Sequence, residues 1–177
     1  MKAMENPTLI IVDGMDNSGK TTLARRLASD LELLYLNQRR KPKDFLDLDQ
    51  DVYNFVNLAK IYPVIMDRWG PISQSVYGPI LRGQSFPTPE ELEQLHQFTS
   101  QVVPLVIYCK PSRKALLDFK EPQLRGVKSK ARQLIKAYDQ VMEGVKPYTS
   151  VCPYDYEKHD YINLRDLVSE HMKGARH

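Results

Sequence analysis

The stretch Gly14–Thr21 holds the residues of this sequence best suited to chemistry, because it fits the pattern G-x-x-x-x-G-K-[ST]. The glycines let the backbone wrap around a phosphate chain and point successive N–H groups at it. Lys20, whose side chain we expect to be exposed, places a positive charge at the phosphates, and Thr21 offers a hydroxyl to Mg²⁺. The pattern predicts a phosphate-binding loop. The alternative is a chance match in a glycine-bearing turn.

Two further charged clusters follow short apolar runs. Asp67-Arg68 comes directly after Pro63–Met66, and Arg39-Arg40-Lys41-Pro42 comes shortly after Leu33–Leu36. Bidentate arginine contacts hold a phosphate in line for transfer, so the clusters favour a phosphotransferase with an anionic second substrate over a hydrolytic switch. The alternatives are a structural ion pair for Asp67-Arg68 and an ordinary solvated loop for the arginine run.

The elements that must position these residues alternate between apolar runs and amphipathic segments. Strands are predicted over Thr8–Val12, Leu33–Leu36, Pro63–Met66, Pro104–Tyr108 and, more weakly, Thr149–Cys152. Helices are predicted over about Lys20–Asp30, Asp51–Lys60, Ser73–Leu81, Pro89–Gln101, Ser112–Asp118, Ser129–Glu143 and Leu164–Met172. This alternation predicts an α/β fold with a parallel sheet covered on both faces. Ligands of such sheets bind at the carboxyl ends of the strands, where the charged clusters stand.

Two local patterns mark helix starts. Thr88-Pro89-Glu90-Glu91 has an N-cap threonine, proline at the first helical position and glutamate at the third. The acidic run Asp44–Asp51 could be a metal cluster, but we interpret it as a solvated loop whose last carboxylate caps the next helix.

Composition excludes several classes of protein. The chain has 177 residues, 42% of them hydrophobic, and a net charge of +3, which suits one globular domain spanning residues 1–177. No apolar run approaches the roughly 20 residues that span a bilayer, and no signal peptide is visible. Cys109 and Cys152 are expected to be reduced, buried thiols of a cytoplasmic protein. The four histidines have no zinc-ligand spacing.

Several of these motifs resemble those of thymidylate kinases. Val12–Thr22 resembles their P-loop, and Arg40-Lys41-Pro42 is similar to their Arg-Glu-Pro. Asp67-Arg68-Trp69 is similar to their Asp-Arg-Tyr/His, which a Ser-Gln…Tyr stretch follows, here Ser73, Gln74 and Tyr77. Pro111–Ala115 is similar to the Pro-x-x-Ala that opens the helix before the lid. The resemblance covers roughly residues 8 to 145.

This resemblance implies the P-loop nucleoside monophosphate kinase fold, with five parallel strands. The implied reaction of nucleotide biosynthesis moves the γ-phosphoryl group of ATP to a deoxynucleoside 5′-monophosphate, with dTMP or a related pyrimidine as the first candidate. ATP and Mg²⁺ are the implied cofactors. Small-molecule nucleotides are the implied partners, rather than nucleic acid or a membrane, and a homodimer stays open.

The resemblance also implies roles for individual residues. The ATP-binding residues would be Gly14, Asn17, Ser18, Gly19, Lys20, Thr21 and Thr22. Asp67 would act near the transferred group through Mg²⁺-bound water or through Arg68. The acceptor-binding residues would be Asp16 at the sugar, Arg40 and Arg68 at the phosphate, Phe55 at the base, and Gln74 and Tyr77. For Phe55 the alternative is an ordinary core aromatic.

A lid is expected over about residues 119–128. Some members of the family carry an arginine inside the P-loop, whereas Asn17 and Ser18 stand there in this chain. A cationic side chain outside the P-loop must therefore stabilise the negative charge that develops during transfer. The stretch 120–127 lies between two predicted helices, has Pro and Gly hinges, and carries Lys120 and Arg125 as candidates. The alternative is a plain surface loop.

Departures from the family pattern leave the base of the acceptor open. The spacing from Asp67 to Ser73 and Tyr77 is one residue longer than usual, and no arginine stands beside Phe55 to read a thymine edge. The chain is also short, as expected of a viral-type member acting in a host cytoplasm. A first rival function is phosphorylation of a nucleoside, or of a hydroxylated base or 5′ end in DNA. A second is a nucleotide-binding switch.

Overall fold

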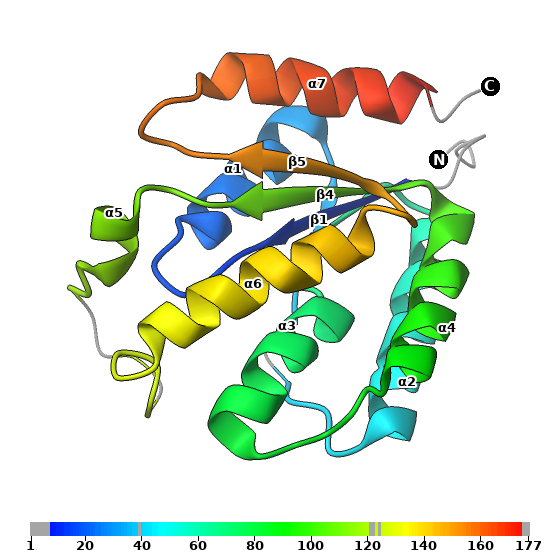
Figure 1. Cartoon of the computed structure of the whole chain (residues 1–177). Helices are drawn as coiled ribbons and strands as arrows, with labels where there is room; N and C mark the ends of the chain where they lie inside the picture. The colour runs from blue at the N-terminus through cyan, green and yellow to red at the C-terminus, as the bar shows by residue number, and fades with distance from the viewer. Residues whose placement is uncertain (1–7, 39, 121–122, 124, 175–177) are drawn as a thin grey trace.

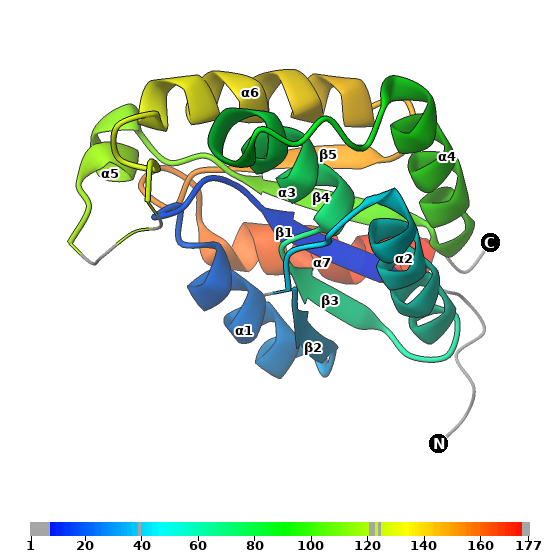
Figure 2. The same ribbon diagram turned by 90° about the horizontal axis from the view of Figure 1, so that it is seen from below.

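The computed structural model describes residues 8–38, 40–120, 123 and 125–174. Its centre is a five-stranded sheet in which every neighbouring pair is parallel, in the order β2-β3-β1-β4-β5 (Figures 1 and 2). The strands are β1 (Leu9–Asp13), β2 (Leu34–Asn37), β3 (Val64–Asp67), β4 (Pro104–Cys109) and β5 (Ser150–Tyr154). The predicted α/β architecture with five parallel strands is therefore confirmed.

Helices cover both faces of this sheet. They are α1 (Lys20–Leu31), α2 (Phe45–Ala59), α3 (Gly70–Tyr77), the π-helix η1 (Gly78–Arg82), α4 (Pro89–Thr99), the 3₁₀-helix η2 (Ser100–Val102), α5 (Arg113–Leu117), α6 (Ala131–Val145) and α7 (Tyr161–Gly174). Helices α1 and α7 lie on one face, and α2, α3, α4 and α6 lie on the other, as the two views show (Figures 1 and 2). The molecule is a three-layer α/β/α sandwich.

Side-chain alternation along the strands explains this arrangement. Leu9 and Ile11 of β1 pack into the core beneath α2, α3 and α6, whereas Ile10 and Val12 pack into the core beneath α1 and α7. All four are completely buried or nearly so, because successive residues of a strand point to opposite faces and both faces are covered here. The uniformly apolar run that predicted β1 follows from this double burial.

The acidic run was interpreted wrongly. Residues 45–51 form the first two turns of α2, and the first carboxylate of the run, Asp44, is the N-cap, accepting a hydrogen bond from the Asp47 N–H at 2.9 Å. The helix begins earlier than expected because Leu48 and Val52, four residues apart, are both buried against the core. By contrast, the capping box of Thr88 and Glu91 at the start of α4 is confirmed.

The remaining differences are shifts of element ends. Strands β2 and β5 extend to Asn37 and Tyr154, beyond their predicted ends, and α3 begins at Gly70, three residues earlier than predicted. Cys109 is buried, which raises its thiol pKa to about 12, whereas Cys152 is only half-buried, and both are free thiols. Among the described residues, no helix has the length and apolar character needed to cross a bilayer.

Candidate active site

The loop after β1 has the backbone of a phosphate cradle. Gly14 passes so close to β4 that a Cβ atom there would lie 2.5 Å from the Cys109 carbonyl oxygen. Asn17 and Gly19 have left-handed backbones, with φ of 67° and 79°, and Gly19 is the N-cap of α1. The loop therefore leads into the N-terminus of a helix whose first N–H groups are available to an anion.

Lys20 is buried, contrary to the expectation that its side chain is exposed. Only 6% of the residue is accessible, and its Nζ donates a hydrogen bond to the Met15 carbonyl oxygen at 3.1 Å. Burial lowers the pKa of this ammonium to about 8, and the charge of nearby Arg68 acts in the same direction. The lysine is thus folded back over its own loop and surrounded by charged groups.

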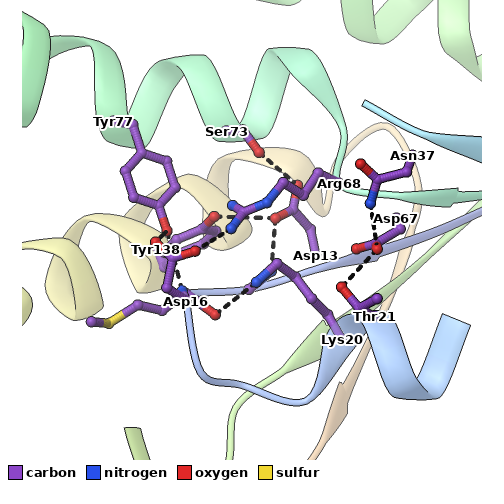
Figure 3. Close-up of polar contacts among 12 residues, drawn as sticks. Asp13, Asp16, Lys20, Thr21, Asn37, Asp67, Arg68, Ser73, Tyr77 and Tyr138 are labelled. Atoms are coloured by element: carbon purple, nitrogen blue, oxygen red, sulfur yellow. Dashed lines mark hydrogen bonds and ion pairs between the residues drawn. The ribbon is translucent and has the colours of Figure 1, made fainter. Parts of the chain in front are cut away.

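Asp67, at the carboxyl end of β3, lies beside Thr21 of α1. One carboxylate oxygen, Oδ2, accepts hydrogen bonds from Thr21 Oγ1 at 2.7 Å and Asn37 Nδ2 at 2.6 Å (Figure 3). The same oxygen accepts a hydrogen bond from Tyr35 Oη at 2.8 Å. The other, Oδ1, is buried and has no hydrogen-bond partner within the described part of the chain. A buried carboxylate oxygen without a partner beside a threonine hydroxyl is a donor set that fits Mg²⁺.

Arg68 forms an ion pair with Asp16 of the phosphate loop, which brings two of the predicted acceptor-binding residues together (Figure 3). Tyr77 Oη donates a hydrogen bond to Asp16 at 2.9 Å. Burial opposes ionisation of Asp16, but the charges of Arg68 and Lys20 outweigh it and hold the pKa of this carboxyl below its usual value. Burial raises the pKa of Tyr77 to about 12, so its hydroxyl remains a donor.

Asp13 is a structural carboxylate for which the sequence indicated no role beyond its place in the motif. It is completely buried, and burial raises its pKa although Arg68 acts against this. Its oxygens accept hydrogen bonds from the Gly14 N–H, the Trp69 N–H, Ser73 Oγ and Tyr138 Oη. It therefore fastens the start of the phosphate loop to the N-terminal end of α3 and to α6, next to Arg68.

A cavity of about 430 Å³ opens beside the phosphate loop. It is lined by Asp16, Asn37, Gln38, Arg40, Lys41, Pro42, Arg68, Gly70, Ser73, Gln74, Tyr77, Leu81, Arg82 and Arg125. Five of these residues are cationic and one is acidic, so the cavity suits an anionic ligand. The structure thus brings six predicted site residues together at this cavity, Asp16, Arg40, Arg68, Gln74, Tyr77 and Arg125, and it adds Arg82, which the sequence did not single out.

Other candidates lie away from this cavity. Phe55 is half-buried and packs with its ring centroid 6.2 Å from that of Trp69, which supports the alternative of a core aromatic. The Lys120 side chain is 83% exposed and its nearest ion-pair partner is Asp118 at 3.9 Å, so of the two proposed lid cations only Arg125 lines the cavity. Residues 121, 122 and 124 of the expected lid lie outside the described residues.

Arg40 reaches the cavity from the loop after β2. Its guanidinium forms ion pairs with Asp47 and Asp51 of α2, both at 2.6 Å. These two carboxylates belong to the acidic run, which therefore orients an arginine. Among the described residues, no group of three or more histidine, cysteine or acidic side chains could hold a metal ion.

The other end of the phosphate loop borders a second cavity, of about 340 Å³. Its lining includes three tyrosines and consists of Ser18, Gly19, Thr22, Leu23, Arg26, Cys109, Tyr154, Tyr156 and Tyr161. Three of the predicted ATP-binding residues, Ser18, Gly19 and Thr22, therefore line this cavity. The Asn17 side chain is used differently, because its Nδ2 donates to the carbonyl oxygens of Ala115 at 2.7 Å and Asp118 at 3.0 Å, at the end of α5.

Comparison with known proteins locates this chain by its fold. No protein-family model and no curated protein sequence matches it. Among solved structures, YorR from Bacillus subtilis in complex with phosphorylated GDP has a TM-score of 0.74 at 19% identity, covering 96% of this chain and 98% of YorR. Thymidylate kinase from Ehrlichia chaffeensis has a TM-score of 0.57 at 15% identity, covering 95% and 99%. Deoxyadenosine kinase from M. mycoides, with dCMP and dCDP bound, has a TM-score of 0.59 at 16% identity, covering 94% and 99%. The chain therefore has the fold of the P-loop kinases.

Proposed function

We propose that this protein transfers the γ-phosphoryl group of ATP to a deoxynucleoside 5′-monophosphate, with dTMP or a closely related pyrimidine nucleotide as the acceptor. One observation carries the proposal: the phosphate loop and the cation-rich cavity meet at a single ion pair. Asp16 belongs to the loop, Arg68 belongs to the strand end beside it, and both line the cavity. A group bound in the cavity therefore lies next to the phosphates that the loop would hold.

The donor site would consist of the loop, the N-terminus of α1 and the second cavity. Lys20 and the loop N–H groups would bind the phosphates, and the aromatic wall that includes Tyr156 suits the flat face of a base. Thr21 and Asp67 would hold Mg²⁺, which when bound neutralises charge on the phosphates.

The acceptor phosphate would be held by arginine. Arg68 is fixed by Asp16, so its guanidinium is oriented before the acceptor arrives. During transfer an acceptor phosphate oxygen bonds to the γ-phosphorus while the bond between that phosphorus and the β-phosphate oxygen breaks, releasing ADP. Lys20 and Arg125 would stabilise the charge that develops on the transferred group.

The preference for an oxo base rests on Gln74 and Arg82. The Gln74 amide nitrogen donates to Gln84 Oε1 at 3.0 Å and to the Phe86 carbonyl oxygen at 3.3 Å, and its Oε1 accepts from an Arg82 terminal nitrogen at 2.6 Å. Arg82 Nε is buried and has no hydrogen-bond partner among the described residues. Arginine offers only donors, so this wall favours O4 of thymine or uracil over the amino groups of cytosine and adenine. Guanine also presents an oxo group, so this wall does not discriminate against dGMP.

The charge of the cavity also separates the proposal from its first rival. Within the described residues, no carboxylate forms an ion pair with Arg82 or Arg125. Unpaired guanidinium groups favour an acceptor that brings its own negative charge over an uncharged nucleoside.

A coupled assay of ADP release tests the proposal. The acceptors are dTMP, dUMP, dGMP, dCMP, dAMP, thymidine and duplex DNA, with a reaction lacking any acceptor. We expect turnover with dTMP or dUMP above that with dCMP and dAMP. Lys20→Ala should abolish it, whereas Lys146→Ala, which removes an exposed lysine on the far end of α6, should not. Phosphorylation of thymidine or DNA but of no monophosphate would establish the first rival, and acceptor-independent hydrolysis would establish the switch.

A further inference from the structure

The carboxylate of Asp67 is held by two side chains of the edge strand β2 that the sequence did not single out. Tyr35 Oη and Asn37 Nδ2 both donate to Oδ2, at 2.8 and 2.6 Å, and Thr21 Oγ1 is the third donor to the same oxygen. Figure 3 shows Asn37 and Thr21 approaching this oxygen from different sides. Asp67 itself is completely buried.

The register of the sheet explains why these residues meet. Asn37 pairs directly with Asp67 across the parallel β2–β3 ladder, and Tyr35 stands two residues earlier on β2, so all three side chains leave the same face of the sheet. That face is the one covered by α1, which supplies Thr21. A register shift of one residue would turn both β2 side chains to the opposite face.

The three donors make the two carboxylate oxygens unequal. Oδ2 is saturated, whereas Oδ1 is buried and has no partner in the described part of the chain. A buried acceptor that makes no hydrogen bond is costly, and native proteins retain few of them without a functional reason. The saturation of Oδ2 therefore reserves Oδ1 for a ligand.

We propose that Tyr35 and Asn37 are positioning residues that fix Asp67 so that Oδ1 remains available to the metal–nucleotide complex. This inference rests on the proposed function, because it needs a phosphate-bound cation beside Thr21. Asn37 has a second location that matters: it also lines the acceptor cavity. The same amide therefore connects the wall of the acceptor site to the carboxylate that faces the metal.

Metal affinity distinguishes positioning from a purely structural role at the sheet edge. Outer-shell partners of a ligating carboxylate are typically worth 10- to 100-fold in metal affinity or activity. We expect Tyr35→Phe and Asn37→Ala each to weaken Mn²⁺ binding to the protein–ATP complex by about 10-fold. In steady-state kinetics of these variants, the fall in kcat should be larger than the change in KM for the acceptor.

The experiment measures free Mn²⁺ by electron paramagnetic resonance in titrations of the full chain with a non-hydrolysable ATP analogue. Tyr53→Phe, which removes a hydroxyl from an exposed tyrosine of α2, is the matched control, and thermal melting checks that each variant is folded. If the wild type binds Mn²⁺ with the analogue and the β2 variants bind it equally well, the inference is wrong while the proposed function stands. If the wild type shows no analogue-dependent Mn²⁺ binding, both are wrong.

Discussion

The buried ammonium of Lys20 makes a sharp prediction about pH. Its pKa is lowered from 10.5 to about 8, first because burial disfavours the charged form and then because Arg68 lies nearby. Bound phosphates would raise the pKa of Lys20 again, because their negative charge stabilises the ammonium. Above pH 8 the free protein therefore carries a neutral Lys20, and ATP binding must take up a proton.

The lowered pKa of Lys20 fixes how strongly ATP binding should depend on pH. A fall from 10.5 to about 8 corresponds to a free-energy cost of about 3 kcal/mol for keeping the ammonium charged in the free protein. The affinity for ATP is thus constant below pH 8 and falls about 10-fold for each pH unit above it, until the lysine of the complex titrates. Between pH 7.5 and pH 9 we expect the Kd to rise roughly 10-fold.

Isothermal titration calorimetry with a non-hydrolysable ATP analogue and Mg²⁺ measures both the Kd and the proton uptake at each pH. At pH 9 the heat of binding should depend on the ionisation enthalpy of the buffer, with close to one proton taken up, and at pH 7 much less so. Lys20→Arg is the control, because a guanidinium stays charged throughout the range. A wild-type Kd that is flat from pH 7.5 to 9.5 would refute the assignment of Lys20 to the phosphates.

Three other changes have defined outcomes. Arg68→Ala should raise KM for the monophosphate and lower kcat, with a loss of about 100-fold in kcat/KM, because the guanidinium both holds and aligns the acceptor phosphate; a change in KM for ATP alone would contradict this. Arg125→Ala should lower kcat at least about 10-fold with little change in KM for ATP. Lys120→Ala, at an exposed position, should change kcat little. If steady-state kinetics show the larger loss of kcat for Lys120→Ala, Lys120 and not Arg125 stabilises the transferred group. His96 stacks on Tyr148, and burial lowers its pKa to about 4. Between about pH 6.5 and pH 4 its imidazole therefore binds a proton in the unfolded chain but stays neutral in the folded protein. The free energy of unfolding should fall by up to about 3 kcal/mol between pH 6.5 and pH 4, and His96→Phe should remove this part of the slope in urea unfolding; equal slopes in both proteins would exclude the mechanism.

The sequence alone was sufficient wherever a local pattern carries its own physical cause. The phosphate loop could be predicted because a side chain would collide at the close approach of Gly14 and because glycine favours the left-handed backbone at Gly19. The three central strands, β1, β3 and β4, could be predicted because burial on both faces leaves uniformly apolar runs. The capping box at Thr88 and Glu91 is equally local, since both partners lie within one turn.

The ends of elements were harder, because packing decides them. The start of α2 depends on whether Leu48 and Val52 find a core to enter, and a charged run gives no local sign of that. Phe55 had two interpretations for the same reason: an aromatic on an amphipathic helix fits a core or a ligand equally well. Its position against Trp69 depends on the strand that follows it in the chain.

Only the tertiary structure decided how the site is completed, because its partners come from segments far apart in the sequence. The predicted Asp67 and Thr21 are joined by Tyr35 and Asn37 through strand register, which no spacing along the chain reveals. Arg82 reaches the cavity because η1 continues α3 past Tyr77 with an altered helical pitch. The sequence by itself thus indicated which kind of ligand to expect, through residues whose types are suited to phosphate. The fold determined the environment of those residues, because burial and register exist only once the layers pack.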